Sequence, residues 1–197
     1  MRKLYTAALL CALTAGVVAP AAVASDASGG AIGAVVADFT LPDADGREHS
    51  LSSLKGRHGT VLIFVSTQCP VSNAYDERME KLAQDLRGRG VNVVGINSNV
   101  AETPADIKRH AAAKKLTFTI LKDRGNVIAD RLDAQVTPEA YFLDASNKLV
   151  YRGRIDNSRN GDSITSQELR DAVEATLAGK PVAKAEARAF GCSIKRG

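Results

Sequence analysis

The sequence is poor in aromatic residues, and it has little net charge once its first residues are set aside. Aromatic side chains make up 5% of the 197 residues, and tryptophan is absent. Arg2 and Lys3 lie in an N-terminal stretch without acidic residues, so residues 25–197 carry 24 basic and 22 acidic side chains. The basic residues are spread along the chain, and no aromatic platform accompanies them. This pattern argues against nucleic-acid binding.

The amino-acid composition shows no strong bias either. The chain is 45% apolar and 24% charged, which is typical of a soluble globular protein and excludes a disordered chain, a collagen or a coiled coil. A mean hydropathy of -0.11 excludes a bundle of membrane helices. No internal repeat and no second core are visible, so we expect one folded domain.

One apolar run stands apart at the N-terminus, over residues 4–18. A short basic segment precedes it, and the motif Ala22-Val23-Ala24 after it matches a small-x-small cleavage site. Polar and helix-breaking residues interrupt the run, which falls short of the roughly 20 apolar residues of a spanning helix. We therefore predict that residues 1–24 are a secretory signal peptide, cut after Ala24. The mature protein would be periplasmic or secreted and would have no stable membrane span.

Few cysteines remain after that cleavage. Cys11 leaves with the signal, and Cys69 and Cys192 stay in a compartment that permits disulfides. Two thiols in an exported protein are more often paired than not. The sequence leaves three possibilities open: a reversible redox couple, a permanent staple that closes a loop of over 100 residues, or two independent thiols.

The rest of the chain divides into a linker, a domain and a tail. Residues 25–31 are small and flexible, residues 32–180 carry the periodic patterns, and residues 181–197 form a tail with Cys192. The continuous apolar runs 61–65 and 91–96 predict strands that are buried on both faces.

Weaker patterns complete the element order. An extended stretch with an Asp-Gly turn is expected over 36–46, a strand near 118–121, and an antiparallel hairpin from 140–143 and 149–155. Helices are expected from Pro70 to Gly88, over 104–115 and 126–132, and from a capping box at 165–168 to Gly179. This order predicts an α/β fold with a central mixed sheet flanked by helices.

Cys69 occupies a position with chemical consequences. It follows the strand 61–65 directly and precedes Pro70 at a helix start. Unpaired amide groups at a helix start favour the thiolate and lower the pKa of the thiol. The carboxyl end of a central strand is also where open α/β sheets place their sites. Because Gln68, Pro70 and Ser72 around it are polar or turn-forming, we expect a reactive or disulfide-forming thiol rather than one buried in a core.

Four motifs in order resemble those of a known family. They are VADFTLPDADG at 36–46, SLSSLKG at 50–56, FVSTQCPVS at 64–72 and VTPEAYFLD at 136–144. Together they are similar to the redoxins, which include the alkyl hydroperoxide reductase/thiol-specific antioxidant (AhpC/TSA) proteins, and the match covers roughly residues 32–156. The peroxiredoxin-like redoxins of bacteria also tend to carry a C-terminal Gly-Cys-Ser-Ile-Lys, found here at 191–195. The resemblance implies a thioredoxin-like fold.

The departures from the family pattern are specific. Ser72 stands where a thioredoxin-like Cys-x-x-Cys site has its second cysteine, so Cys69 has no neighbouring thiol partner. Leu62 replaces the proline that peroxiredoxins place seven residues before the peroxidatic cysteine, whereas Ser66 fits the position three residues before it. By the same resemblance, Pro138 aligns with the cis-proline of thioredoxin folds, and Thr137 would offer backbone groups to a bound substrate chain.

These residues suggest a thiol enzyme without a cofactor. The main hypothesis is an exported thiol–disulfide oxidoreductase in which Cys69 is the nucleophile and Cys192 the candidate resolving cysteine. Its substrate would bear a thiol or a disulfide, on a protein or a small molecule, and its electron donor is not identified by the sequence. Thr137 and Pro138 would bind the substrate; the supporting residues would be Ser66, Gln68, Pro70 and Ser72.

Two other functions stay open. A thiol peroxidase would reduce a hydroperoxide through a sulfenic acid on Cys69. A non-catalytic thioredoxin-fold binding module would use the Thr137-Pro138 loop for docking and the disulfide as a staple. No metal is expected, because His49, His58 and His110 lack metal-ligand spacing, and we predict that they are solvated surface residues.

Overall fold

A six-stranded mixed sheet forms the centre of the protein. The computed structural model describes residue 1 and residues 29–197, so the predicted signal peptide lies outside the described part of the fold. The strand order is β5-β4-β3-β7-β8-β9, with β3 parallel to β4 and antiparallel to β7. Its strands, in chain order, are β3 (Gly59–Phe64), β4 (Val91–Asn97), β5 (Thr119–Lys122), β7 (Glu139–Asp144), β8 (Leu149–Gly153) and β9 (Glu186–Ala187). The α/β fold with a central mixed sheet is confirmed.

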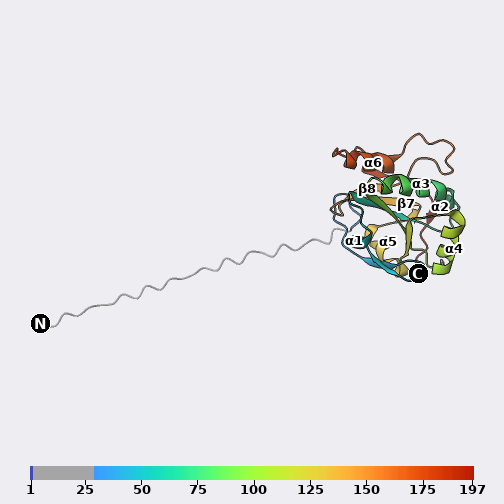
Figure 1. Cartoon of the computed structure of the whole chain (residues 1–197), viewed down its shortest axis with the longest axis horizontal. Coiled ribbons are helices and arrows are strands. Elements are labelled where there is room, and N and C mark those ends of the chain that lie inside the picture. Colours follow the sequence, from blue (N-terminus) through green and yellow to red (C-terminus); the bar gives the residue numbers. More distant parts are fainter. Residues whose placement is uncertain (2–28) are drawn as a thin grey trace.

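Helices cover both faces of this sheet (Figure 1). They are α1 (Leu51–Leu54), α2 (Pro70–Ala74), α3 (Asp76–Arg87), α4 (Pro104–Lys114), α5 (Val127–Leu132) and α6 (Glu168–Leu177), with a short 3-10 helix, η1 (Arg124–Asn126), before α5. Two small antiparallel sheets flank the large one. One pairs β1 (Thr40–Pro42) with β2 (Glu48–Ser50), and the other pairs β6 (Val136–Thr137) with β10 (Cys192–Ser193).

The side chains of β3 alternate between two apolar cores. Val61 and Ile63 pack in the core that contains α3 and α6, whereas Leu62 and Phe64 pack in the core that contains α1 and α5. All four are fully buried, and burial of each such side chain contributes roughly 1.5–3 kcal/mol. The continuous apolar run therefore belongs to a strand that is buried on both faces, as its sequence predicts.

Two helices begin and end differently from the sequence-based expectations. The helix after Pro70 is divided at Tyr75 into α2 and α3. The capping box expected at 165–168 is wrong, because α6 begins at Glu168 and its N-cap residue makes no side-chain cap bond. Thr165 Oγ1 instead accepts a hydrogen bond from Asn157 Nδ2 at 2.6 Å. The Glu168 carboxylate is ion-paired with Arg154 and Lys184. The Glu168 side chain therefore binds two cations and does not reach back to a cap residue.

The tail continues the fold after α6. Strand β9 adds an edge strand to the main sheet, beside β8. Further along the tail, β10 pairs with β6. Ile194 is buried in the core on the α1 and α5 side. At the N-terminal side, Gly30 already contacts the domain, since its carbonyl accepts a hydrogen bond from Arg152 Nη1 at 3.0 Å. No helix within residues 29–197 has the length and apolar character needed to cross a membrane.

Candidate functional site

Strand register brings the predicted site residues to one edge of the sheet. Phe64 at the end of β3 pairs with Ile96 of β4 on one side and with Glu139 of β7 on the other. Asn97 at the end of β4 pairs with Lys122 at the end of β5. The loops after β3 and β4 and the Thr137-Pro138 segment before β7 therefore meet at this edge, where open α/β sheets place their sites.

Cys69 is the N-cap residue of α2, and its sulfur has two close polar neighbours. The Ser72 backbone N–H donates to Cys69 Sγ at 3.3 Å, and the Cys69 thiol donates to the Thr137 carbonyl at 3.3 Å. The residue is 2% exposed, so the expectation that its polar sequence neighbours keep it out of the interior is wrong. Those neighbours do not determine its burial, because Thr137, 68 positions further along the chain, lies against its sulfur.

Cys192 approaches from the tail. It lies in β10 directly opposite Thr137 in the antiparallel ladder, with Ser193 opposite Val136. Both Cys69 and Cys192 are free, and Cys192 is half-buried. The same residue, Thr137, thus lies beside Cys69 through its carbonyl and opposite Cys192 in the ladder.

The two thiols affect each other in opposite directions. Burial opposes ionisation of Cys69, but hydrogen bonds from the Cys192 thiol and from the Ser72 N–H outweigh it and lower the pKa of Cys69. For Cys192, its hydrogen bond to Cys69 and its own burial raise the pKa. The pair therefore ionises first at Cys69, and Cys192 retains its proton as the donor.

A buried polar network supports residues 65–69, the loop between β3 and α2, which we call the Cys69 loop. Ser66 Oγ accepts a hydrogen bond from the Cys69 N–H at 3.1 Å and donates to Glu102 at 2.5 Å. Ser72 Oγ accepts from the Ser66 N–H at 3.1 Å. Glu102 also accepts from Thr67 and from Asn97, and these hydrogen bonds outweigh burial and lower the pKa of its carboxyl. Glu102 is therefore an ionised, buried carboxylate at the base of this loop.

The remaining predicted site residues divide into two groups. Thr137 and Pro138 are buried, and the peptide bond between them is cis, as the family resemblance implies. The backbone edge of Thr137, expected to meet a substrate chain, is paired with β10. Gln68 and Pro70 are exposed; Pro70 opens α2, and the backbone N–H of Gln68 donates to Ser66 Oγ at 3.2 Å. The Gln68 side chain makes no hydrogen bond within the described residues.

Sequence reasoning missed the buried polar residues after β4 and at the end of β5. Glu102, Asn99 and Lys122 are each at most 5% exposed, and each bonds to another segment of this edge. A signal was available in the sequence, because the polar run 97–99 comes directly after an apolar strand. Its position at the carboxyl end of a central strand marks it as a site segment.

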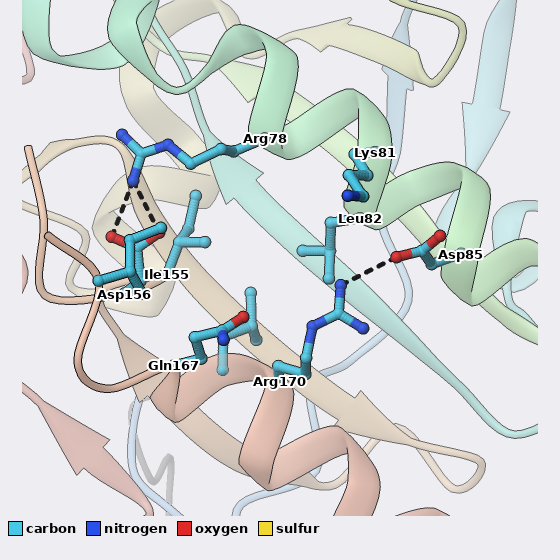
Figure 2. Close-up of a pocket in the computed structure, with 10 residues that line it drawn as sticks. Arg78, Lys81, Leu82, Asp85, Ile155, Asp156, Gln167 and Arg170 are labelled. Carbon is cyan, nitrogen blue, oxygen red and sulfur yellow. Dashed lines mark hydrogen bonds and ion pairs between the residues drawn. The ribbon is translucent and has the colours of Figure 1, made fainter. Parts of the chain in front are cut away.

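One described cavity lies away from the thiols. It has a volume of about 500 Å³ and lies between α3, α6 and the segment after β8 (Figure 2). In Figure 2, Arg78 of α3 points toward Asp156 and Arg170 of α6 toward Asp85, with N–O distances of 2.7 and 3.0 Å. The two arginines on its walls are thus paired with carboxylates, and neither cysteine lines it.

Two of the three histidines are not free surface residues. His49 Nε2 lies 2.9 Å from Asp43, and His110 Nε2 lies 3.1 Å from Asp76. The expectation of solvated side chains is therefore wrong for these two, because each has a carboxylate partner, whereas His58 is exposed. Within residues 29–197, no three histidine, cysteine or acidic side chains gather as a metal site would need.

A large part of the sequence matches a described family. The model of the AhpC/TSA family matches residues 32–152. The chain belongs to the AhpC/TSA family. Among curated relatives, the thiol-disulfide oxidoreductase ResA of Geobacillus thermodenitrificans is 29% identical over 119 residues, which cover 60% of this chain and 67% of ResA. The chloroplastic peroxiredoxin Q of Oryza sativa subsp. japonica is 29% identical over 126 residues, covering 60% of this chain and 57% of that protein.

Solved structures give the same classification of the fold. An uncharacterized conserved protein from Geobacillus kaustophilus superposes with a TM-score of 0.80 at 34% identity, covering 85% of this chain and 93% of the other. A secreted disulfide oxidoreductase of Mycobacterium tuberculosis, described as homologous to E. coli DsbE, has a TM-score of 0.55 at 26% identity, covering 70% of this chain and 95% of the other. The fold of this AhpC/TSA member is thioredoxin-like.

Proposed function

We propose that this protein is a thiol–disulfide oxidoreductase whose redox couple is Cys69 and Cys192. The observation that carries the proposal is the meeting of the two thiols at Thr137, with the pKa of Cys69 lowered and that of Cys192 raised. A thiolate is the form of cysteine that attacks a disulfide. The similarity to ResA supports the same chemistry.

The reaction needs both sulfurs in sequence. The Cys69 thiolate attacks one sulfur of a substrate disulfide, a mixed disulfide forms, and the other substrate sulfur leaves as a thiolate and takes up a proton. Cys192 then loses its proton and attacks Cys69, so the Cys69–Cys192 disulfide forms and the second substrate sulfur is released. The substrate gains two electrons and the protein loses two, which an external thiol donor must restore.

The tail strand β10 limits the access of a substrate to Cys69. Cys69 is 2% exposed, and the two residues of β10 lie on the open edge of β6. A disulfide on a protein substrate reaches Cys69 only when β10 moves away from β6, which breaks the pairing of its two residues. A displaced β10 leaves the edge of β6 available to an extended substrate chain, as strand addition requires.

Cysteine variants test this proposal in a Cys11→Ser background, where Cys69 and Cys192 are the remaining cysteines. Reduction of a disulfide-bonded peptide is measured with a small dithiol as donor. We expect Cys69→Ser to abolish turnover and Cys192→Ser to accumulate a mixed disulfide on Cys69, detected by mass. Wild-type turnover by Cys69→Ser contradicts the proposal. If Cys69→Ser also binds the protein's partner normally, the protein is a non-catalytic binding module and the disulfide has a structural role.

Peroxide reduction is a second candidate function, favoured by the burial of Cys69 and by the similarity to peroxiredoxin Q. A hydroperoxide is small enough to reach a covered thiol. The Cys69 thiolate would take the distal oxygen, forming a sulfenic acid and releasing an alcohol or water, and Cys192 would condense with it to a disulfide and water. Consumption of hydrogen peroxide by the wild type, lost in Cys69→Ser, selects this function; its absence leaves disulfide exchange.

We also propose that the protein is exported. The basic, apolar and small-residue segments of 1–24 support this, and a similar solved protein is described as secreted. Export makes a reversible disulfide compatible with the compartment. N-terminal sequencing of the protein from the exported fraction tests the prediction, which requires a first residue of Ser25.

A further inference from the structure

Residues 98–102, the segment between β4 and α4, lie between the two cysteine-bearing parts of the chain. We call this segment the β4 loop. Ser98, Asn99 and Glu102 within it are each at most 4% exposed. The large majority of buried polar side chains in folded proteins are hydrogen-bonded, so the partners of these three show what the loop holds in place.

One end of the β4 loop holds the Cys69 loop. Glu102 accepts from Ser66 Oγ at 2.5 Å, from the Thr67 N–H at 2.7 Å and from Thr67 Oγ1 at 2.8 Å. Ser66 in turn accepts from the Cys69 N–H. A carboxylate with several donors forms strong, charge-assisted hydrogen bonds. The Cys69 backbone is therefore two hydrogen bonds away from Glu102.

The other end holds the tail that carries Cys192. Asn99 Oδ1 accepts from the Lys195 N–H at 2.8 Å, and the Lys195 carbonyl accepts from the Val100 N–H at 2.9 Å. Lys195 is three residues after Cys192. These bonds fix the tail just beyond β10, on the same segment that holds Ser66 and Thr67.

The β4 loop is itself fixed to the sheet. The buried Lys122 Nζ donates to the Asn99 carbonyl at 2.6 Å and to Asn97 Oδ1 at 3.1 Å, and Ser98 Oγ donates to Asp123 at 2.8 Å. Asn97 Nδ2 also donates to Glu102 at 2.7 Å. Both attachments thus have the ends of β4 and β5 as a common base.

We propose that Glu102 and Asn99 are positioning residues that set the separation of the two thiols. Glu102 fixes the loop of Cys69, and Asn99 fixes the tail of Cys192, so the β4 loop clamps the couple together. This inference rests on the proposed function, because it concerns the pair that carries it. Neither residue touches the sulfurs; each acts on how readily the disulfide closes.

The test is the equilibrium between the dithiol and the Cys69–Cys192 disulfide in glutathione buffers of varied ratio, followed by mass in the Cys11→Ser background. Glu102→Gln replaces one carboxylate oxygen, which accepts hydrogen bonds, by an NH2 group, which cannot accept them from the same donors. Asn99→Ala removes the acceptor for the Lys195 N–H. We expect each to lower the equilibrium constant for disulfide closure by about tenfold or more, the order expected from losing a hydrogen bond to a charged or buried group.

Glu80→Gln is the matched control. Glu80 is also a buried glutamate that accepts a backbone N–H, from Thr117 at 2.6 Å, and a hydroxyl, from Thr117 Oγ1 at 2.7 Å. It lies in α3 and makes no bond to either cysteine-bearing segment. A general loss of stability appears in Glu80→Gln and Glu102→Gln alike, whereas the thiol equilibrium is expected to change in Glu102→Gln alone of these two.

The outcomes separate the clamp from the function. A wild-type protein that never forms the reversible couple overturns the proposed function. A wild-type couple that closes normally, together with Glu102→Gln and Asn99→Ala at the wild-type equilibrium, overturns the clamp alone. If Glu102→Gln does not fold, Ser66→Ala breaks the single link between Glu102 and the Cys69 N–H. A several-fold decrease of the constant in Ser66→Ala supports the clamp, and an unchanged constant contradicts it.

Discussion

Cys69 and Cys192 differ in both properties that govern thiol exchange, ionisation and access. Cys69 has the lowered pKa but is nearly inaccessible, while Cys192 has the raised pKa and is partly exposed. The Cys192 proton contributes to both shifts, since its hydrogen bond stabilises the Cys69 thiolate. The reactivity of Cys69 therefore depends on a residue 123 positions later in the chain.

Single-cysteine variants test this dependence. Cys192→Ala removes the donor, while Cys192→Ser keeps an O–H near the Cys69 sulfur. We expect the Cys69 pKa to be higher in Cys192→Ala than in Cys192→Ser, because the thiolate loses a hydrogen bond. The pH dependence of thiolate absorbance in the ultraviolet measures both values. Equal pKa values in the two variants contradict the assigned role of the Cys192 proton.

At the residue scale, the sequence predicted the thiols and only part of their support. Cys69, Ser66, Ser72, Thr137 and Pro138 were indicated by motif and by strand position, and the structure places them together. Glu102 was missed because nothing local distinguishes a glutamate before a helix from a solvated one. Its role depends on donors 35 and 36 positions away.

Among the elements, β10 is the one whose docking most directly affects the site. Gly191 precedes it and lies so close to the cis-proline loop that a Cβ there would be 1.9 Å from the Thr137 carbonyl oxygen. Its φ of 156° also disfavours other residues. The glycine is therefore what allows β10 to pair with β6.

Gly191→Ala is expected to release β10. A clash of this kind costs about 1–3 kcal/mol, so reduced Cys192 should be alkylated about tenfold faster or more. Gly88→Ala is the control, because Gly88 has a helical φ of -63° and open space where a Cβ would stand. Equal alkylation rates in wild type and Gly191→Ala disagree with a docked β10.

Helix α6 is anchored by a buried ion pair at its first residue. The Arg154 guanidinium, against the opposition of burial, lowers the pKa of Glu168 to about 2, from 4.5. A carboxyl whose pKa is lowered in the folded state stabilises that state above its unfolded pKa, and the effect is lost as pH falls toward the folded pKa. The relevant window lies between about pH 4.5 and pH 2.

Acid unfolding checks the contribution of this pair. We expect the wild type to lose up to about 3 kcal/mol of unfolding free energy across that window through Glu168, and Glu168→Gln to lose correspondingly less. Glu174→Gln is the comparison, since Glu174 pairs with Arg89 at the surface and exposed ion pairs contribute little. Identical acid dependence in wild type and Glu168→Gln would exclude this role.

Element prediction succeeded where the hydrophobic pattern is local. The apolar runs of β3 and β4 are each visible in a few adjacent residues. The tail strands β9 and β10 are two residues each and carry no such pattern. They are strands because β8 and β6 offer open edges, which is a property of the assembled fold.

For the whole molecule, topology turns separate motifs into one site. The thioredoxin-like sheet places the ends of β3, β4 and β5 beside the start of β7, and the tail returns across that edge. The fold class followed from the element order and the family resemblance. The burial of Cys69 did not, because it arises from contacts that only the folded chain makes.

The reduction potential of the Cys69–Cys192 pair tests the central claim most directly. It is measured in the Cys11→Ser protein by titration against a thiol buffer, with both cysteines followed by mass. A catalytic couple is expected to titrate reversibly at about -120 to -230 mV. A pair that stays oxidised below about -300 mV is a structural staple, and that result, or two thiols that never pair, would contradict the account.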